Sequence, residues 1–245
     1  MNRQALILAA GLGTRLRPLT DDRPKALVNC AGKPLLAHVI DQVIQAGCNH
    51  IVINVHYFAA QVIDYVQALN IPGIKFFISD ESTEIKDTGG ALVHALPLLQ
   101  QNLPVLICNT DILTDYNLEQ VFSEHETSSA SATLVVQQRP SSRKLIFDEF
   151  MQLQGWQNNA TGERIGEITD LPRSQWAFSG IHMIDIALIN AFKVRYATAP
   201  FPIIHAYLAS LNHIYVRGLS MSPESWWMDC GTAEKIAVAA AHFSK

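Results

Sequence analysis

Long apolar segments are absent from this sequence. No apolar run approaches the roughly 20 residues that a transmembrane helix needs, and the N-terminal stretch MNRQALILAAG lacks the apolar core and the cleavage pattern of a signal peptide. These absences argue against a membrane partner and against secretion. We therefore expect a cytoplasmic protein.

Cysteine and positive charge are also scarce. The four cysteines are scattered and form no CxxC pair, which argues against a zinc site or a disulfide scaffold and predicts reduced thiols. The nine histidines show no HxxxH or HExxH spacing. Because the formal net charge is −4, nothing in the overall charge favours a nucleic-acid partner. Any anion-binding site must therefore be local.

The first 110 residues alternate between short apolar runs and amphipathic segments. The runs are almost continuously apolar, which is typical of strands covered on both faces in a parallel sheet. We expect strands at residues 6–9, 51–53, 74–78 and 105–108. We expect helices at residues 34–46, 59–69 and 89–99. Strands and helices in this order predict an α/β fold with a doubly wound, mostly parallel sheet.

The sequence pattern changes after about residue 128. The segments ATLVVQQ, KLIFDEF and WAFSGIHMI predict further strands with turns between them. Helices are expected again at residues 185–192, 201–210 and 232–242. No internal repeat, low-complexity tract or linker divides the chain. We therefore expect a single domain over residues 1–245.

Residues 11–33 form a long connection after the first expected strand. A loop of this length is uncommon in a compact domain unless it has a function. Gly11 and Gly13 lack a Cβ, so backbone N–H groups there can approach an anion closely. The same loop gathers positive charge at Arg15, Arg17, Arg23 and Lys25, which suits a polyphosphate. The alternative is a solvated turn whose basic side chains merely face water.

Two common phosphate-binding loops do not fit this segment. The stretch G-L-G-T-R-L lacks the third glycine of G-x-G-x-x-G. The second strand ends in Asn54-Val55-His56, without the acidic residue that binds a ribose hydroxyl. The P-loop pattern G-x-x-x-x-G-K-[ST] is absent. A nicotinamide-dependent oxidoreductase and a P-loop kinase or ATPase are therefore disfavoured.

Two motifs in succession resemble a known family. LAAGLGTRLRPLT, followed by PKALVNCAGKPLL, is similar to the signature of the sugar-1-phosphate nucleotidyltransferases. The resemblance continues over almost the whole chain, through DTGG, NTD, FSGI and WMDCGT at residues 87–90, 109–111, 178–181 and 227–232. It implies a Rossmann-like nucleotidyltransferase fold with an inserted, smaller β-rich part that binds sugar. Residues 1–127 would then be mainly the nucleotide-binding half, and residues 128–245 mainly the sugar-binding half.

The resemblance implies a reaction between two polyanions. An oxygen of a sugar 1-phosphate attacks the α-phosphorus of a nucleoside triphosphate, and pyrophosphate leaves. The nucleophile is already an anion, so positioning and charge neutralisation replace a general base. Arg15 would hold the leaving pyrophosphate and Lys25 would lie along the phosphates, which makes them the expected catalytic residues. By the same pattern the nucleotide would be lined by Ala9, Ala10, Gly11, Gly13 and Thr14.

Candidates for the base and the sugar follow from later motifs. Thr88 and Gly89 stand at an expected helix start, where backbone groups can contact a base edge, although a simple helix cap is the alternative. For the sugar, Asn109 offers an amide and Ser179-Gly180 a close backbone approach. Glu163 is a looser candidate. Asn109 has the alternative role of satisfying backbone groups at a strand end.

Magnesium is the expected cofactor. It prefers oxygen ligands and is usually held by one or two carboxylates together with substrate phosphates. The family pattern implies Asp111 and Asp229 as that pair. Each has an alternative as a cap of a turn or a helix, and Asp115 is a nearby competitor for the metal. Cys230, beside Asp229, is expected to be a small buried apolar residue rather than a reactive thiol.

The expected substrates are UTP and N-acetylmuramate 1-phosphate, in cell-wall recycling. This rests on the segment FDEFMQLQGWQNNATGE with WAFSGIH, which looks most like the branch with that activity. Mannose- or heptose-1-phosphate with GTP, and phosphocholine with CTP, are the alternatives. The choice of base and the oligomeric state stay open.

The sequence departs from the family pattern in two places. Thr110 stands where many members have glycine, which narrows the approach of the sugar or its phosphate. The glutamate-lysine-proline element before the FSG strand is missing, and residues 167–172 read EITDLP instead. A second phosphate-binding lysine is therefore not evident.

A hypothesis of another class is a non-catalytic subunit that binds a nucleotide sugar and regulates a partner. Such a protein is expected to lose an arginine, a lysine or a metal-binding aspartate. This chain keeps Arg15, Lys25, Asp111 and Asp229. An enzyme is therefore the preferred hypothesis.

Overall fold

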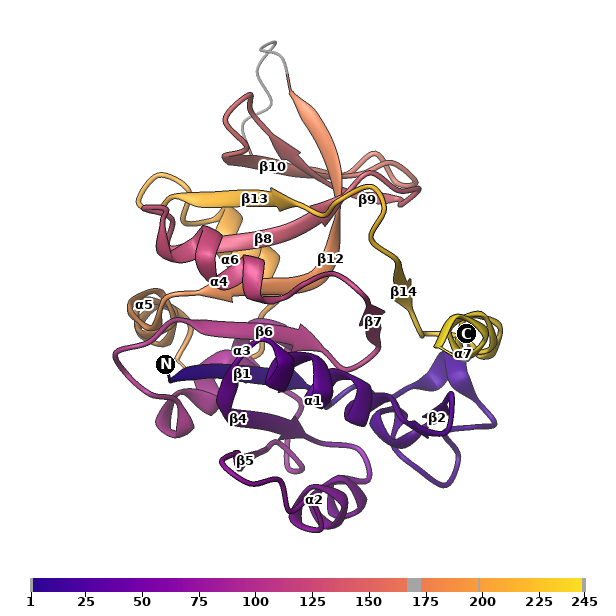
Figure 1. Ribbon diagram of the computed structural model, residues 1–245. Helices are drawn as coiled ribbons and strands as arrows, with labels where there is room; N and C mark the ends of the chain where they lie inside the picture. The colour runs from indigo at the N-terminus through magenta and orange to yellow at the C-terminus, as the bar shows by residue number, and fades with distance from the viewer. Residues whose placement is uncertain (1, 167–172, 198, 244–245) are drawn as a thin grey trace.

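The computed structural model describes residues 2–166, 173–197 and 199–243. A ten-stranded sheet runs through it in the order β11-β10-β9-β12-β6-β1-β4-β5, with β8 paired to β12 and β13 beside β8 (Figure 1). Within the described ranges, no helix is long and apolar enough to span a bilayer.

The first half of the chain builds the parallel part of this sheet. Its strands β4, β1 and β6 pair in parallel, and β5 extends the sheet beside β4. The strands are β1 (Arg3–Leu8), β4 (Cys48–Val55), β5 (Lys75–Asp80) and β6 (Val105–Asn109). The intervening helices are α1 (Leu35–Gln45), α2 (Ala59–Gln67) and α3 (Asp87–Ala95), the last followed by the 3-10 helix η3 (Leu96–Leu98). The expected strands, helices and doubly wound fold class are confirmed.

Side chains of β1 show why both faces of the sheet must be covered. Ala5 and Ile7 enter one apolar core, and Leu6 enters a second, with all three fully buried. The first core also takes residues from α1, α2 and α7, and the second takes residues from α3, α5 and α6. Because successive strand residues point to opposite faces, a run such as ALIL is stable only between two helical layers.

The second half extends the sheet mostly with antiparallel strands. Strand β12 pairs with β6, β8 and β9, and so joins the two halves. The strands are β8 (Ala132–Gln137), β9 (Arg143–Phe147), β10 (Leu153–Asn158), β11 (Arg164–Gly166), β12 (Ser174–Ile184) and β13 (Val216–Ser220). The helices are α4 (Glu119–Glu126), α5 (Ile186–Tyr196), α6 (Ile203–Leu208) and α7 (Ala233–Phe243). The three strands and three helices expected after residue 128 are present, whereas β10, β11, β13 and α4 were not predicted.

Several short elements also escape the sequence patterns. The long loop contains two 3-10 helices, η1 (Thr14–Leu16) and η2 (Lys25–Leu27), and a two-residue hairpin. The hairpin strands are β2 (Asn29–Cys30) and β3 (Lys33–Pro34). A separate two-stranded sheet pairs β7 (Ile112–Thr114) with β14 (Trp227–Asp229). Elements of two or three residues are too short to show a hydrophobic period, so tertiary contacts decide them.

Candidate active site

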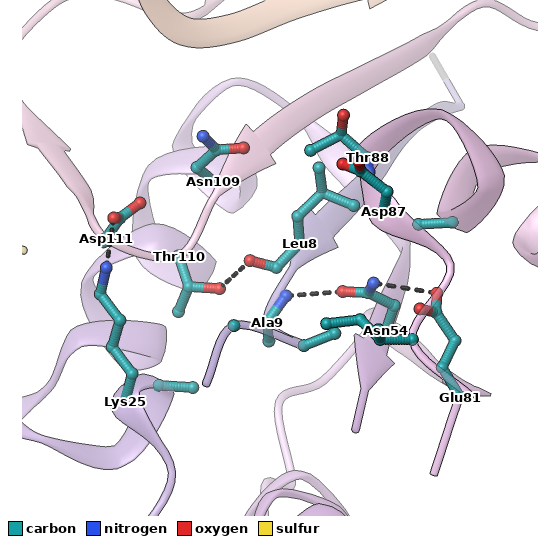
Figure 2. A pocket seen from close by; sticks show the side chains of 15 residues that line it. Leu8, Ala9, Lys25, Asn54, Glu81, Asp87, Thr88, Asn109, Thr110 and Asp111 are labelled. Atoms are coloured by element: carbon teal, nitrogen blue, oxygen red, sulfur yellow. Dashed lines mark hydrogen bonds and ion pairs between the residues drawn. The ribbon is translucent and has the colours of Figure 1, made fainter. Parts of the chain in front are cut away.

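A pocket of about 230 Å³ opens at the carboxyl ends of β1, β4, β5 and β6 (Figure 2). This edge is where ligands bind in doubly wound sheets. Seven of the residues expected at the site line the pocket: Ala9, Ala10, Gly11, Lys25, Thr88, Asn109 and Asp111. The other expected residues lie beside the pocket or farther away.

The fold requires glycine at only one of the two loop glycines. Gly11 lines the pocket, and a Cβ added to it would meet nothing within 4 Å. Gly13 has a φ of 65°, and its Cβ would approach the Cβ of Lys25 to 3.0 Å. Its carbonyl accepts a hydrogen bond of 2.8 Å from the Thr20 hydroxyl. Gly13 therefore shapes the loop, while Gly11 leaves the pocket wall open. Thr14 begins η1 next to them and is exposed.

A buried amide and carboxylate fix the start of this loop. The Asn54 Oδ1 accepts a 2.6 Å hydrogen bond from the Ala9 N–H, and its Nδ2 donates to Glu81 Oε1 at 3.0 Å (Figure 2). The other Glu81 oxygen accepts from the Lys86 N–H at 3.2 Å. Both Asn54 and Glu81 are buried and line the pocket. Sequence analysis missed both, although Asn54 near the end of β4 and Glu81 directly after β5 agree with the rule for ligand sites in such sheets.

Lys25 and Asp111 form an ion pair at one side of the pocket (Figure 2). Both side chains are largely buried, with 14% and 20% of their surface exposed. A charge held this far from water is stable only with a partner. Thr110 between Asn109 and Asp111 turns its hydroxyl toward the Leu8 carbonyl, to which it donates a hydrogen bond.

The small sheet brings Asp229 beside Asp111. The Cys230 N–H donates a 2.7 Å hydrogen bond to the Asp111 carbonyl, and β14 pairs with β7 directly after Asp111. One oxygen of Asp229 is 3.5 Å from the Lys235 Nζ, and the other is buried without a hydrogen-bond partner. Cys230 is fully buried, and burial raises the pKa of its thiol to about 12. The expectation that Cys230 is an unreactive buried residue is confirmed.

Two aspartates held together by their backbones, one with an unpartnered carboxylate oxygen, offer the kind of donor that magnesium takes together with phosphates. No cluster of three or more potential metal-binding side chains occurs among the described residues. A cation here would therefore need substrate oxygens to complete its ligands. Asp115 is engaged elsewhere, since its Oδ1 accepts a 2.7 Å hydrogen bond from the Trp226 N–H.

Arg15 reaches the same corner from the glycine loop. A Cβ added to Gly231 would lie 2.7 Å from the Arg15 guanidinium and 2.7 Å from the Asp229 Oδ1. Only glycine fits between these two groups. Within the described part of the chain no carboxylate lies within 4.0 Å of this guanidinium, and Arg15 is exposed. Its charge is therefore available to a ligand.

The Thr88-Gly89 segment has structural contacts as well as a place at the pocket. The Thr88 hydroxyl accepts a 3.0 Å hydrogen bond from the Ile203 N–H. The Gly89 N–H donates to the Phe201 carbonyl at 2.8 Å, and a Cβ on Gly89 would lie 2.2 Å from the Phe201 ring. Gly89 is thus committed to packing α3 against the chain before α6, and Thr88 alone of the two lines the pocket.

Only some of the residues expected to bind the sugar lie at the pocket. Asn109 ends β6 at the pocket, and Gly180, with a φ of 80°, is so close that its Cβ would lie 2.9 Å from the Asn109 Nδ2. Ser179 is fully buried, and its hydroxyl accepts a 3.3 Å hydrogen bond from the Ile181 N–H. Glu163 is exposed in the turn between β10 and β11 and does not line the pocket. The EITDLP segment at residues 167–172 lies outside the described residues.

A glycine loop, a lysine, an arginine and two aspartates thus gather at the carboxyl edge of a parallel sheet in an α/β protein, an arrangement that suits phosphate ligands. Residues 4–245 match the model of the family described as nucleotidyl transferase, and the chain belongs to this family. The family resemblance expected from the sequence is confirmed.

Curated relatives are similar over different parts of the chain. An N-acetylmuramate alpha-1-phosphate uridylyltransferase of Caulobacter vibrioides is 49% identical over 109 residues, covering 44% of this chain and 45% of that protein. The mannose-1-phosphate guanylyltransferase catalytic subunit beta of Xenopus tropicalis is 28% identical over 235 residues, covering 93% of this chain and 61% of that protein. The matches thus span about half of these relatives' lengths.

The fold is also found among solved structures. A UDP-glucose pyrophosphorylase from Acinetobacter baumanii superposes with a TM-score of 0.82 at 17% identity, covering 99% of this chain and 93% of that one. This likeness confirms the fold class.

Proposed function

We propose that this protein transfers a nucleotidyl group from a nucleoside triphosphate to a sugar 1-phosphate and releases pyrophosphate. The observation that carries the proposal is the meeting of Lys25, Asp111, Asp229 and Arg15 at one edge of the sheet. Family membership and the named activities of the relatives support it. Cationic and anionic side chains at this edge of the sheet suit phosphoryl chemistry better than redox chemistry.

In the proposed reaction a phosphate oxygen of the sugar attacks the α-phosphorus of the nucleotide. The bond from this phosphorus to the oxygen that bridges to the β-phosphorus breaks, and pyrophosphate leaves with the electron pair. Ala9, Ala10 and Gly11 offer backbone at the pocket wall for the nucleotide, fixed by Asn54. Lys25 would neutralise the phosphates, and exposed Arg15 would hold the leaving pyrophosphate.

Asp111 and Asp229 would hold magnesium together with the substrate phosphates. When bound, the cation neutralises charge that develops on the phosphate oxygens during transfer. In the free protein, the ion pair with Lys25 keeps the Asp111 carboxylate at the pocket. We assign residues 1–127 mainly to the nucleotide and residues 128–245 mainly to the sugar.

We favour UTP and N-acetylmuramate 1-phosphate as the substrates. The support is the 49% identity to a uridylyltransferase with this acceptor, which extends over 44% of the chain. The second candidate is a mannose-1-phosphate guanylyltransferase, which a weaker identity of 28% over 93% of the chain supports. The two candidates differ in both substrates, so one experiment distinguishes them.

The test is pyrophosphate release with magnesium for UTP, GTP, CTP and dTTP against a set of sugar 1-phosphates and phosphocholine. The set includes N-acetylmuramate 1-phosphate and mannose 1-phosphate. We expect the fastest release with UTP and N-acetylmuramate 1-phosphate. Release with GTP and mannose 1-phosphate instead supports the second candidate. Nucleotide-sugar binding without any release would contradict the enzyme and favour a regulatory subunit.

A further inference from the structure

Arg139 lies at the junction of three segments that come from distant parts of the chain. It follows β8, and its guanidinium donates a 3.0 Å hydrogen bond to the Phe178 carbonyl of β12. The guanidinium carbon stands 4.1 Å from the centre of the Trp227 ring of β14. Figure 1 shows β14 on the side of the sheet where β8 ends. This stacking geometry is typical of a cation–π contact, which holds the guanidinium in one orientation.

The charge of Arg139 has no close counterion in the part of the chain that the structure describes. No carboxylate of those residues lies within 4.0 Å of it, and its Nε is buried without a hydrogen-bond partner. Burial lowers the pKa of Arg139. The negative charge of Asp229, which lies farther away, acts in the opposite direction and raises this pKa. Lys144 fixes the backbone beneath by donating a 2.6 Å hydrogen bond to the Arg139 carbonyl. A fixed, partly desolvated cation without a counterion suits an anionic ligand.

The surroundings of Arg139 place that ligand beside the proposed reaction. The Trp227 Nε1 donates a 2.9 Å hydrogen bond to the Ser179 carbonyl, one residue before Gly180. Gly180 in turn adjoins the Asn109 side chain at the pocket. On the other side, Trp227 is two residues from Asp229 in β14. Arg139 therefore borders the region proposed for the sugar and not the one proposed for the nucleotide.

We propose that Arg139 binds an acidic substituent of the acceptor sugar and so selects sugar 1-phosphates that carry a carboxylate. A guanidinium donates two parallel hydrogen bonds to a carboxylate, which a neutral hydroxyl cannot match. N-acetylmuramate carries a carboxylate on its lactyl ether, whereas N-acetylglucosamine has a hydroxyl at the same carbon and is otherwise the same sugar. The inference rests on the proposed function and adds a residue that determines its acceptor.

The first test compares the two 1-phosphates of these sugars as acceptors with UTP. Arg139→Met removes the positive charge. Arg139→Lys keeps the charge but cannot donate two parallel hydrogen bonds to a carboxylate. Arg143→Met is the matched control. Arg143 is exposed in the same region, and this substitution removes one positive charge, as Arg139→Met does. We expect Arg139→Met to lower kcat/KM for the acidic acceptor about 10- to 100-fold, as for a lost charge-assisted hydrogen bond. We expect kcat/KM for the neutral acceptor to change less than about threefold in every variant.

An equal loss of kcat/KM for both acceptors in Arg139→Met would show that Arg139 only supports the fold. An unchanged kcat/KM for both acceptors would show that Arg139 does not contact the acceptor. Both results overturn the proposal. Wild-type turnover with neutral sugar phosphates alone would overturn it too, while leaving the nucleotidyl transfer intact.

A binding measurement separates the inference from the proposed function. Calorimetric titration of free N-acetylmuramate and free N-acetylglucosamine, each with the full chain, needs no turnover. Tighter binding of the acidic sugar that disappears in Arg139→Met and persists in Arg143→Met supports the proposal even if no pyrophosphate is released. Equal affinity of the wild-type protein for the two sugars, or no binding of either, would overturn it.

Discussion

The backbone N–H of Cys230 donates a 2.7 Å hydrogen bond to the carbonyl oxygen of Asp111. This bond continues the two-stranded sheet of β7 and β14, and it brings together two aspartates that are far apart in the chain. The sheet is therefore part of the site, because the position of Asp229 relative to Asp111 depends on it.

The two aspartates are expected to be essential for turnover, and the loss of turnover should exceed any loss of stability that follows when Asp111 no longer pairs with Lys25. Asp111→Asn and Asp229→Asn each remove a carboxylate from the proposed magnesium site, so we expect a loss of at least about 100-fold in kcat. Asp115→Asn is the control, because asparagine still accepts the hydrogen bond from the Trp226 N–H. Pyrophosphate release and circular dichroism check the prediction. Turnover retained in Asp111→Asn, or an equal loss in Asp115→Asn, would contradict it.

Asn54→Ala is expected to weaken both the fold and nucleotide binding. It leaves the Ala9 N–H and Glu81 without their buried partner, at a cost of about 1–3 kcal/mol. Urea unfolding and nucleotide titration measure the two effects. Asn49→Ala, which removes an exposed hydrogen bond to Asn2, should stay within about 0.5 kcal/mol of wild type. If Asn54→Ala behaves like this control, the buried network does not hold the loop.

Gly11→Ala and Gly89→Ala are expected to act on different properties. The Cβ at Gly89 would lie 2.8 Å from the Phe201 carbonyl, so the backbone must shift and stability should fall by about 3 kcal/mol or more. The Cβ at Gly11 meets nothing in the free protein but adds a methyl group to a residue that lines the pocket. Thermal unfolding should therefore change only in Gly89→Ala, and Gly11→Ala should lose affinity for nucleoside triphosphate. The reverse pattern would contradict this division.

Stability is expected to fall below pH 6.5 because of His182. Its ring lies 5.9 Å from that of Tyr207, and neither of its nitrogens has a hydrogen-bond partner. Burial lowers the pKa of His182 to about 3 in the folded chain. The unfolded chain binds this proton near pH 6.5, so the stabilisation present above that pH is lost as the pH falls, by about 2 kcal/mol at pH 5.

Urea unfolding at pH 7.5 and pH 5 measures this effect. In His182→Leu the fall in the free energy of unfolding between these two pH values should be smaller by about 2 kcal/mol. His213→Leu, which changes an exposed histidine, should keep the wild-type fall. An equal fall in the wild type and His182→Leu would show that other groups carry the pH dependence.

The family resemblance named Lys25 and Asp111 from motifs at opposite ends of the parallel half. The structure joins these two residues in one ion pair, and their roles stay a prediction. Asn54 and Glu81 were missed, because a single polar residue at the end of a strand gives no pattern of its own. Arg139 was missed for the same reason, since its turn has the composition of an ordinary surface loop.

The sequence by itself determined the alternation of buried strands and amphipathic helices, and with it the α/β class. The cause is local, since hydrophobic period and chain stiffness act over a few residues. Only the tertiary structure decided that Asp229 meets Asp111, that Asn54 holds Ala9 and that Arg139 stacks on Trp227. These contacts depend on strand order and register, which are set by the packing of the whole sheet and have no signature in any one segment.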